Sequence, residues 1–143
     1  MIGLVQRVSE ASVSVNNEII GEIEQGMLVL LGVEKDDGPE QIEKLANKLC
    51  RYRIFSDSDG KMNLNVEQIG GKVLVVSQFT LVADTQKGNR PGFSRGATPE
   101  HGNAIYLQFI ESLRQKGIVV ETGQFGAEMK VALVNDGPAT FQF

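Results

Sequence analysis

Two short polar segments have the residue types and the setting of a chemical site. The first, Ser77-Gln78-Phe79-Thr80, follows four consecutive branched residues, Val73 to Val76. Such a run has no helical stripe and favours a strand that is buried on both faces and ends where the polar groups begin. The second is Asn135-Asp136-Gly137-Pro138, a predicted tight turn between strands. Gly137 has no Cβ to crowd a ligand, and an X-Pro bond can adopt the cis form at a cost of about 0.5 to 1 kcal/mol.

The usual signatures of a nucleophile, a triad or a metal site are missing. Cys50 is the only cysteine and falls on the apolar face of a predicted helix, so we expect a packed thiol rather than a nucleophile. His101 has no Ser, Cys or Asp partner at a recognised spacing, so we expect a surface histidine rather than a catalytic one. The Asp57-Ser58-Asp59-Gly60 fragment lacks the distal Glu of a calcium loop. No metal and no cofactor is therefore expected.

A polar, basic and glycine-rich stretch, residues 84–96, follows the first segment and has no periodicity. Long loops of this kind in compact domains are usually functional or disordered. Arg51 and Arg53 form a second basic cluster, and either cluster could hold a few phosphates. The formal net charge of -4 argues against a protein that coats nucleic acid by bulk charge. A solvated surface without a ligand is the alternative for both clusters.

The elements that must position these segments alternate between strand and helix patterns. A length of 143 residues with 41% hydrophobic content predicts one domain over 1–143. No signal peptide or membrane-spanning run is present, so we expect a cytoplasmic protein without membrane contacts. Asn16-Asn17 predicts a hairpin turn, Asp37 a helix cap, and Thr98-Pro99-Glu100 a helix start. Helices are expected at 39–52 and 99–116, and strands at 2–8, 11–15, 18–23, 27–33, 54–55, 73–76, 118–122, 129–134 and 139–143.

Two longer stretches, Ser77-Gln78-Phe79-Thr80-Leu81 and Asn135-Asp136-Gly137-Pro138-Ala139-Thr140, together resemble the signature motifs of the D-aminoacyl-tRNA (D-tyrosyl-tRNA) deacylases. The resemblance covers essentially the whole chain, including Val5-Gln6-Arg7-Val8 and Gly88-Asn89-Arg90-Pro91. It implies an α/β fold of mixed, largely antiparallel β-sheets in a barrel-like or sandwich arrangement, with two main helices on one side. Two departures from the family pattern are Ala139, where Val is usual, and Gly92, where Ser is common.

The resemblance also implies a homodimer whose active site lies at the subunit interface. One subunit would supply Ser77-Gln78-Phe79-Thr80, and the other would insert Gly137-Pro138 in the cis form. The implied reaction is hydrolysis of the ester that joins a D-amino acid, or glycine, to the 3′-terminal adenosine of tRNA, with rejection of the L form. Backbone N–H groups of Phe79 and Thr80 could bind the oxyanion, and the Thr80 hydroxyl could position water or the carbonyl. The family resembles RNA-assisted catalysts, in which the ribose 2′-OH orients or activates the water.

Selectivity would then depend on the inserted segment. Carbonyls of Gly137 and Pro138 would bind the substrate ammonium and exclude an L side chain by a steric clash. Arg7 would brace the turn at residues 135–138 by hydrogen bonding its carbonyls. Phe125 and Met129 are candidates for an adenine pocket, with core packing as the alternative. The basic residues expected to contact the acceptor-stem phosphates of aminoacyl-tRNA are Lys87, Arg90 and Arg95.

Two other functions fit part of the pattern. A non-catalytic homodimer that binds tRNA or another nucleic acid would use the same basic loop, and it predicts binding without turnover. A protein that binds a small metabolite could place Gly88 and Gly96 near a phosphate. The second signal is weak, because the sequence lacks the glycine-rich turn from strand to helix that P-loop and dinucleotide-binding proteins use.

Overall fold

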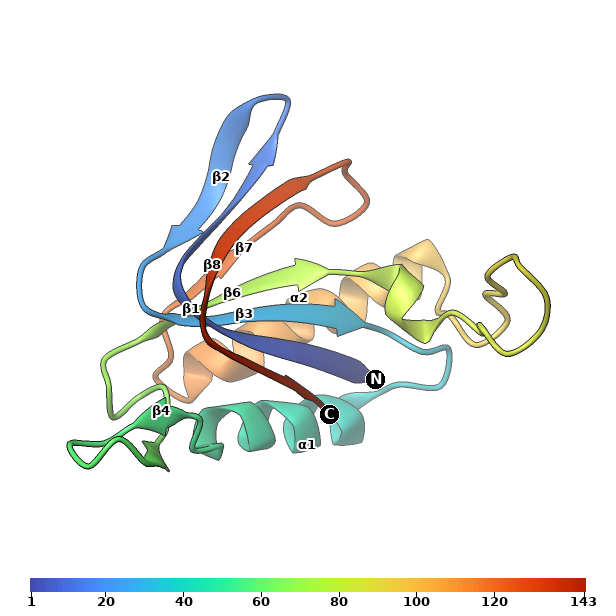
Figure 1. Cartoon of the computed structure of the whole chain (residues 1–143). Helices are drawn as coiled ribbons and strands as arrows, with labels where there is room; N and C mark the ends of the chain where they lie inside the picture. The colour runs from blue at the N-terminus through green and yellow to red at the C-terminus, as the bar shows by residue number, and fades with distance from the viewer.

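One long strand, β1 (Ile2–Val15), organises the sheet of this computed structural model, which describes residues 1–143 (Figure 1). Its first half pairs antiparallel with β3 and its second half with β2, while β8 runs antiparallel along both halves. β3 and β6 are parallel, as are β6 and β7. The other elements are β2 (Glu18–Ile23), β3 (Gly26–Gly32), α1 (Pro39–Arg51), β4 (Phe55–Ser56), β5 (Met62–Leu64), β6 (Lys72–Ser77), the 3-10 helix η1 (Phe79–Val82), α2 (Pro99–Gln115), β7 (Val120–Thr122) and β8 (Lys130–Gln142).

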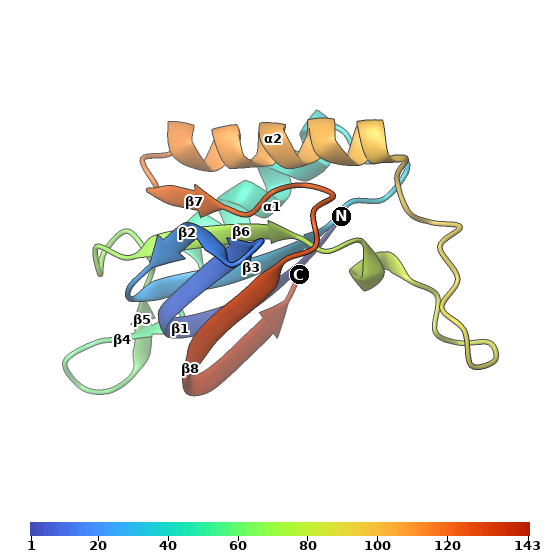
Figure 2. The ribbon, with the colours of Figure 1, turned by 90° about the horizontal axis from the view of Figure 1, so that it is seen from above.

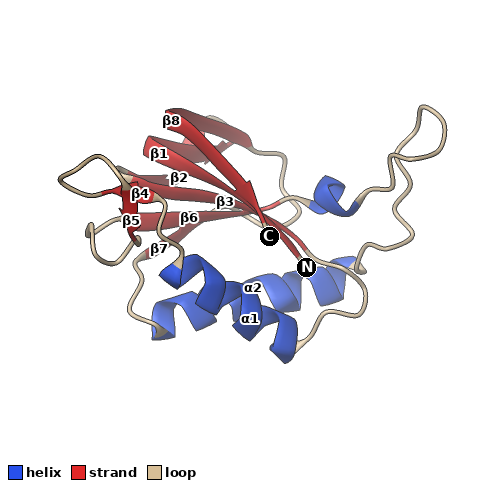
Figure 3. Cartoon of the chain, turned by 60° about the horizontal axis from the view of Figure 1, so that its bottom comes forward, coloured by secondary structure: helices blue, strands red, loops and turns tan.

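The sheet coils until it is nearly closed, and the two helices cover one of its faces (Figures 2 and 3). Side chains of β6 alternate between two apolar layers. Val73 and Val75 belong to the core beneath α1 and α2, whereas Leu74 and Val76 face a second core enclosed by β1, β2 and β8. The predicted mixed α/β fold, with a barrel-like sheet and helices on one side, is confirmed. So is the predicted burial of the central strand on both faces.

The hairpin between β1 and β2 turns at the predicted Asn16-Asn17 pair. Both asparagines have positive φ, 51° and 65°, which is the conformation of a two-residue turn that matches the twist of antiparallel strands. The sequence patterns at 2–8 and 11–15 belong to one strand rather than to two, because β1 changes partners from β3 to β2 along its length. Both chain ends lie together, and Gly3 and Phe143 exchange two backbone hydrogen bonds of 2.9 Å.

The helices begin and end within one residue of their predicted bounds. Thr98 caps α2 as expected, since its hydroxyl accepts a hydrogen bond of 3.2 Å from the N–H of His101. The cap predicted for α1 is wrong. Gly38 occupies that position and donates its N–H to the Gln41 side chain at 2.8 Å, while Asp37 accepts hydrogen bonds from the N-terminal ammonium and from the N–H of Glu34. No helix combines the length and the apolar composition required to cross a membrane.

Cys50 and Tyr106 show how the helices meet the core. Cys50 is half-buried against the larger apolar cluster, as predicted, and burial raises the pKa of its thiol. Tyr106 on α2 is buried, and its hydroxyl donates a hydrogen bond of 2.9 Å to the carbonyl of Val75 on the central strand. Burial raises the pKa of Tyr106 to about 12. This side chain therefore couples the sheet to the helix layer.

Replacing Tyr106 with phenylalanine should destabilise the fold and remove a pH dependence. The hydrogen bond to Val75 that this change removes is worth about 1 kcal/mol. Because the folded pKa exceeds the unfolded value of roughly 10, the tyrosine's contribution is intact below about pH 10. It falls as the pH rises toward 12. Urea unfolding should be measured at a series of pH values between about 10 and 12. Over this range the free energy of unfolding of wild type should fall by up to about 2 kcal/mol relative to that of Tyr106→Phe. Parallel curves for the two proteins would contradict the assignment.

The turn predicted at residues 135–138 is wrong, because β8 continues through this segment as a single strand. β1 provides a pairing partner on both sides of it: Asn135 pairs with Val8, and Thr140 pairs with Gln6. Four residues of β8, 136–139, therefore lie opposite a single residue of β1, Arg7, and form a bulge in the pairing of the two strands. The Gly137–Pro138 peptide bond is cis, as the resemblance implies.

Candidate active site

A cavity of about 530 Å³ lies at the end of β6, where the polar segment begins. Ser77, Gln78 and Phe79 form one side of it, and Phe125 and Met129, from the connection between β7 and β8, form another. The rest of the wall consists of the capping residue Thr98 and of apolar side chains and glycines in or next to β3, β6, η1, the basic loop, α2 and β8. None of its residues carries an ionisable side chain. The cavity is thus an apolar pocket with a few convergent polar groups, the usual form of a small-ligand site.

The polar segment leaves the sheet through a change of backbone conformation. Gln78 donates its N–H to the carbonyl of Leu31 at 2.8 Å, which continues the pairing of β3 with β6 by one residue. The chain then forms η1, whose first N–H groups, those of Phe79 and Thr80, have no acceptor within the helix. Thr80 is exposed and does not line the cavity, and its hydroxyl accepts a hydrogen bond from Gln78 Nε2.

Two glycines make room for the aromatic and thioether side chains of the cavity. A Cβ on Gly102, in the first turns of α2, would lie 3.1 Å from Cζ of Phe125. A Cβ on Gly123 would lie 2.7 Å from the sulfur of Met129. Phe125 also packs against Tyr106, with ring centroids 5.9 Å apart. Phe125 and Met129, the residues predicted for an adenine pocket, thus both line the cavity, and Phe125 also packs against α2 and the core.

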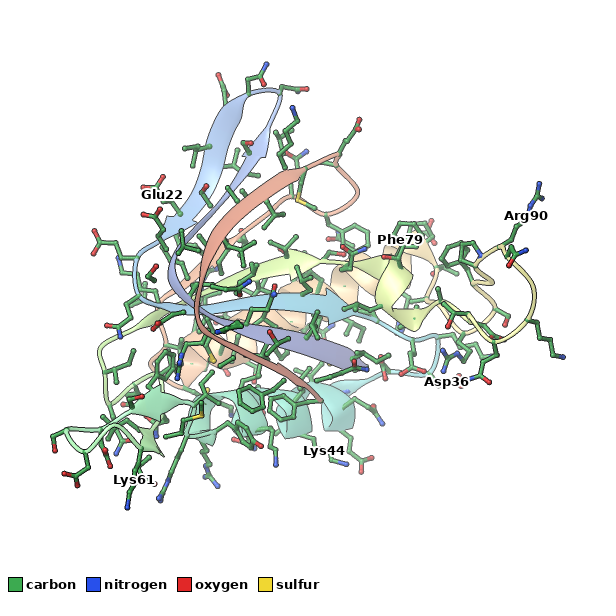
Figure 4. All side chains as sticks on the ribbon, viewed as in Figure 1. Glu22, Asp36, Lys44, Lys61, Phe79 and Arg90 are labelled. Carbon is green, nitrogen blue, oxygen red and sulfur yellow. The ribbon has the colours of Figure 1, made fainter.

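The basic loop, residues 84–96, leaves the body of the protein near η1 and returns to it before α2 (Figure 1). Phe93 from this loop lines the cavity, and its ring lies 5.2 Å from that of Phe79. Arg95 donates to the carbonyls of Val82 and Ala83, both at 3.4 Å. Lys87 and Arg90 make no ion pair or side-chain hydrogen bond, and Figure 4 shows Arg90 extending into solvent far from Phe79. The loop thus closes one side of the cavity and exposes two free cations.

The Gly137-Pro138 segment lies elsewhere in the same chain. Both residues are exposed, and neither they nor Arg7 line the cavity. Arg7 is buried beneath them, and its Nε donates to the carbonyl of Asp136 at 2.8 Å while Nη1 donates to the carbonyl of Ile54 at 2.7 Å. Gly137 has a φ of +127°, and a Cβ at this position would lie 2.6 Å from Nη2 of Arg7. The predicted contact between Arg7 and this segment is present, but one chain does not bring the two motifs together.

Two further sequence expectations concern titratable residues. His101 is half-buried rather than on the surface, and its Nε2 lies 2.8 Å from the carbonyl oxygen of Asp37, so it links α2 to the segment before α1. It does not line the cavity. No three His, Cys, Asp or Glu side chains are grouped closely enough to hold a metal ion.

Phe93 and Gly102 are cavity residues that the sequence analysis missed. Phe93 is the one aromatic residue in a loop that is otherwise polar and basic, which is a usable signal for a contact with the site. Gly102 falls inside a helical pattern, where glycine lowers helix stability by about 1 kcal/mol relative to alanine. A glycine at such a position therefore indicates that another group packs closely against the helix. In the structure this group is the ring of Phe125, a contact distant in the sequence that no local pattern predicts.

The fold defines the structural class of the chain. It superposes on a structure described as a c-Myc DNA Unwinding Element Binding Protein with a TM-score of 0.94 and 38% sequence identity, covering 100% of this chain and 97% of the other. A structure described as "a probable eukaryotic D-amino acid tRNA deacylase" gives a TM-score of 0.87 at 18% identity, covering 99% and 97% of the two chains. The second likeness shows the fold alone.

The sequence places the chain more narrowly. Residues 4–143 match the family model described as D-Tyr-tRNA(Tyr) deacylase. A D-aminoacyl-tRNA deacylase of Alteromonas mediterranea is 76% identical over 143 residues, which is 100% of this chain and 99% of the relative. One from Pseudoalteromonas atlantica is 64% identical over 141 residues, 99% and 97% of the two chains. The chain therefore belongs to the D-Tyr-tRNA(Tyr) deacylase family, a family of ester hydrolases.

Proposed function

We propose that the chain hydrolyses the ester of D-aminoacyl-tRNA, and of mischarged glycyl-tRNA, to free tRNA and amino acid, while it rejects L-aminoacyl-tRNA. The observation that carries the proposal is the cavity at the end of β6, where Ser77, Gln78 and Phe79 meet an apolar pocket in a chain of this family. Residues 1–143 act as one domain in the cytoplasm, and the reaction uses no cofactor.

The chemistry depends on positioned dipoles rather than on a protein base. Water attacks the ester carbonyl, and the N–H groups of Phe79 and Thr80 bind the oxyanion that develops. The Thr80 hydroxyl, held by Gln78, positions the water or the carbonyl. Because no ionisable side chain lines the cavity, the 2′-OH of the terminal ribose orients or activates the water. Ser77 completes the polar wall beside the reacting groups.

Chiral selection comes from a second subunit. In a homodimer, the exposed Gly137-Pro138 segment of one subunit enters the cavity of the other, and this explains why both residues are absent from the cavity of their own chain. Their carbonyls bind the substrate ammonium and occupy the space that an L side chain needs. Arg7 holds the segment through the carbonyl of Asp136. A clash of this kind discriminates more strongly than a missing methylene does.

Phe125 and Met129 form the pocket for the terminal adenine. Phe125→Ala should raise KM for D-tyrosyl-tRNA by roughly 10-fold and change kcat little, because stacking of a base on an aromatic ring is worth about 1–3 kcal/mol. Phe125→Leu is the matched control, since it keeps most of the apolar volume and removes the ring. Steady-state kinetics and urea unfolding of both variants check this prediction. A loss of stability with an unchanged KM would instead support a packing role.

Lys87, Arg90 and Arg95 contact phosphates of the acceptor stem. Lys87 and Arg90 have no partner in the chain and lie in the part of the loop that extends into solvent (Figure 4), whereas Arg95 is anchored to the backbone of the η1 region, next to the cavity residue Val82. Phosphate contacts supply affinity that depends on salt and position a nucleic acid without reading its sequence. The loop would thus orient the 3′ end toward the cavity.

A non-catalytic nucleic-acid-binding dimer is the second candidate, and it is favoured by one observation. The structural neighbour with 38% identity is described as a DNA Unwinding Element Binding Protein. The two functions differ in turnover. A deacylase releases many equivalents of D-tyrosine from D-tyrosyl-tRNA per subunit, whereas a binding protein releases none above the spontaneous rate and shields the ester. A time course with substrate in large excess over protein separates the two functions.

A further inference from the structure

A second hollow, of about 460 Å³, lies at the end of α1 and has a basic rim. Lys48 and Arg51, three residues apart on α1, lie on one side of the helix, and Arg53 follows the helix. Figure 4 shows Lys44 and Lys61 along the lower edge of the molecule, with Lys61 at the opposite end from Arg90. The residues that line the basic hollow are Lys48, Arg51, Tyr52, Arg53, Ile54, Met62 and Phe141.

The cations of the basic hollow have no acidic partner. Lys48, Arg51 and Arg53 are exposed, and none of them makes an ion pair or a side-chain hydrogen bond in the chain. The ammonium of Lys48 lies 5.0 Å from the centre of the Tyr52 ring, which holds it at the rim. In a chain with a net charge of -4, three unpaired cations around an apolar floor fit a polyanion with apolar sugar faces.

The basic hollow is joined to the Gly137-Pro138 segment by one side chain. Arg7 donates from Nη1 to the carbonyl of Ile54, which lines the hollow, and from Nε to the carbonyl of Asp136, which precedes Gly137. Phe141 of β8, which follows the Gly137-Pro138 segment in the sequence, also lines the hollow. Because Arg7 links the two, the basic hollow stays next to the Gly137-Pro138 segment when that segment binds another molecule.

We propose that the basic hollow binds backbone phosphates of the tRNA whose 3′ end occupies the cavity of the partner subunit. This inference rests on the proposed function, because it takes the Gly137-Pro138 segment to enter that cavity. Arg51 and Arg53 provide the planar donors that bind phosphate oxygens in pairs. The basic loop of one subunit and the basic hollow of the other then hold the same acceptor stem from two sides.

The direct test is the salt dependence of binding, measured with a tRNA that carries D-tyrosine through a 3′-amide and cannot be hydrolysed. Arg51→Gln/Arg53→Gln should reduce the slope of log Kd against log salt by about one for each phosphate that the hollow no longer binds, measured between about 50 and 200 mM salt. Lys72→Gln/Lys130→Gln is the matched control, because it removes the same charge from exposed residues that line neither cavity. A slope equal to that of wild type in the arginine variant would overturn the proposal.

Hydrolysis of two substrates separates this inference from the proposed function. The arginine variant should lose about 10-fold in kcat/KM on D-tyrosyl-tRNA and nothing on D-tyrosyl-adenosine, which has no phosphate to contact. Equal losses on both substrates would show that the arginines act through the position of Gly137-Pro138, and would overturn phosphate binding. If wild type hydrolyses neither substrate, the proposed function fails, while the binding slopes still decide whether the hollow contacts tRNA.

Discussion

Replacing Gly137 with alanine is expected to lower kcat/KM for D-tyrosyl-tRNA by about 100-fold or more. Gly137 has a φ of +127°, which an L side chain rarely adopts, and an added Cβ would lie 2.6 Å from Nη2 of Arg7. Arg7 cannot give way without loss, because the same guanidinium donates to the carbonyls of Asp136 and Ile54. Displacement of this group moves the carbonyls proposed to bind the substrate ammonium, and a misplacement of about 1 Å can cost about 100-fold in rate.

Gly70→Ala is the matched control for this substitution. Gly70 also has a positive φ, +65°, but a Cβ there meets no atom within 4 Å. Both variants carry the backbone strain, of about 1 kcal/mol, and only Gly137→Ala disturbs Arg7. Urea unfolding should therefore show a loss of stability in both variants, larger for Gly137→Ala because Arg7 is displaced, and kinetics on D-tyrosyl-tRNA should show a loss of activity in Gly137→Ala alone. Activity of Gly137→Ala within a few-fold of the Gly70→Ala value would show that the segment has no part in the reaction.

Two inactive variants should restore activity when they share a dimer. In the proposed homodimer, each site combines the cavity of one subunit with the Gly137-Pro138 segment of the other. Gly102→Val fills the cavity, because a Cβ at Gly102 already lies 3.1 Å from Phe125. A heterodimer of Gly102→Val and Gly137→Ala subunits places both changes in one site and leaves the other site intact. It should have about half the activity of wild type, whereas either parent has almost none.

The measurement uses coexpressed subunits with different affinity tags, purified in sequence so that only heterodimers remain. A heterodimer of wild-type and Gly137→Ala subunits is the control and should also retain one working site. Activity in the mixed variant no greater than in the parents, with the control active, would show that each subunit contains its own complete site. A monomer in solution would contradict the composite site directly.

Most of the fold follows from the sequence, because its helices and buried strands have strong periodic patterns. The stripe of α1 and the branched run of β6 are local signals, and both are confirmed. The continuity of β8 through Gly137-Pro138 was missed, since a local turn signal was outweighed by pairing with β1 on both sides. The cap at α1 was missed for a similar reason: the carboxylate of Asp37 binds the distant N-terminal ammonium instead.

The candidate site could be predicted in part. Gln78 and Phe79 follow a recognisable strand end and line one cavity with Phe125 and Met129, whose contact with adenine stays a prediction. The contribution of Phe93 depends on a loop folding back onto the cavity, which leaves no periodic trace in the sequence. The proposed role of Gly137 requires a second subunit, because in one folded chain Gly137 does not line the cavity that Phe79 lines.

The most direct test of the proposed function compares D-tyrosyl-tRNA, L-tyrosyl-tRNA and glycyl-tRNA as substrates of the purified wild-type protein, with a chelator-treated sample and a protein-free sample alongside. We expect rapid loss of the D-tyrosyl and glycyl esters, no loss of the L-tyrosyl ester above the spontaneous rate, and no effect of the chelator. Equal rates for the D and L esters would contradict chiral selection by Gly137 and Pro138. No hydrolysis of any ester, despite binding of tRNA, would show that the chain is a binding protein.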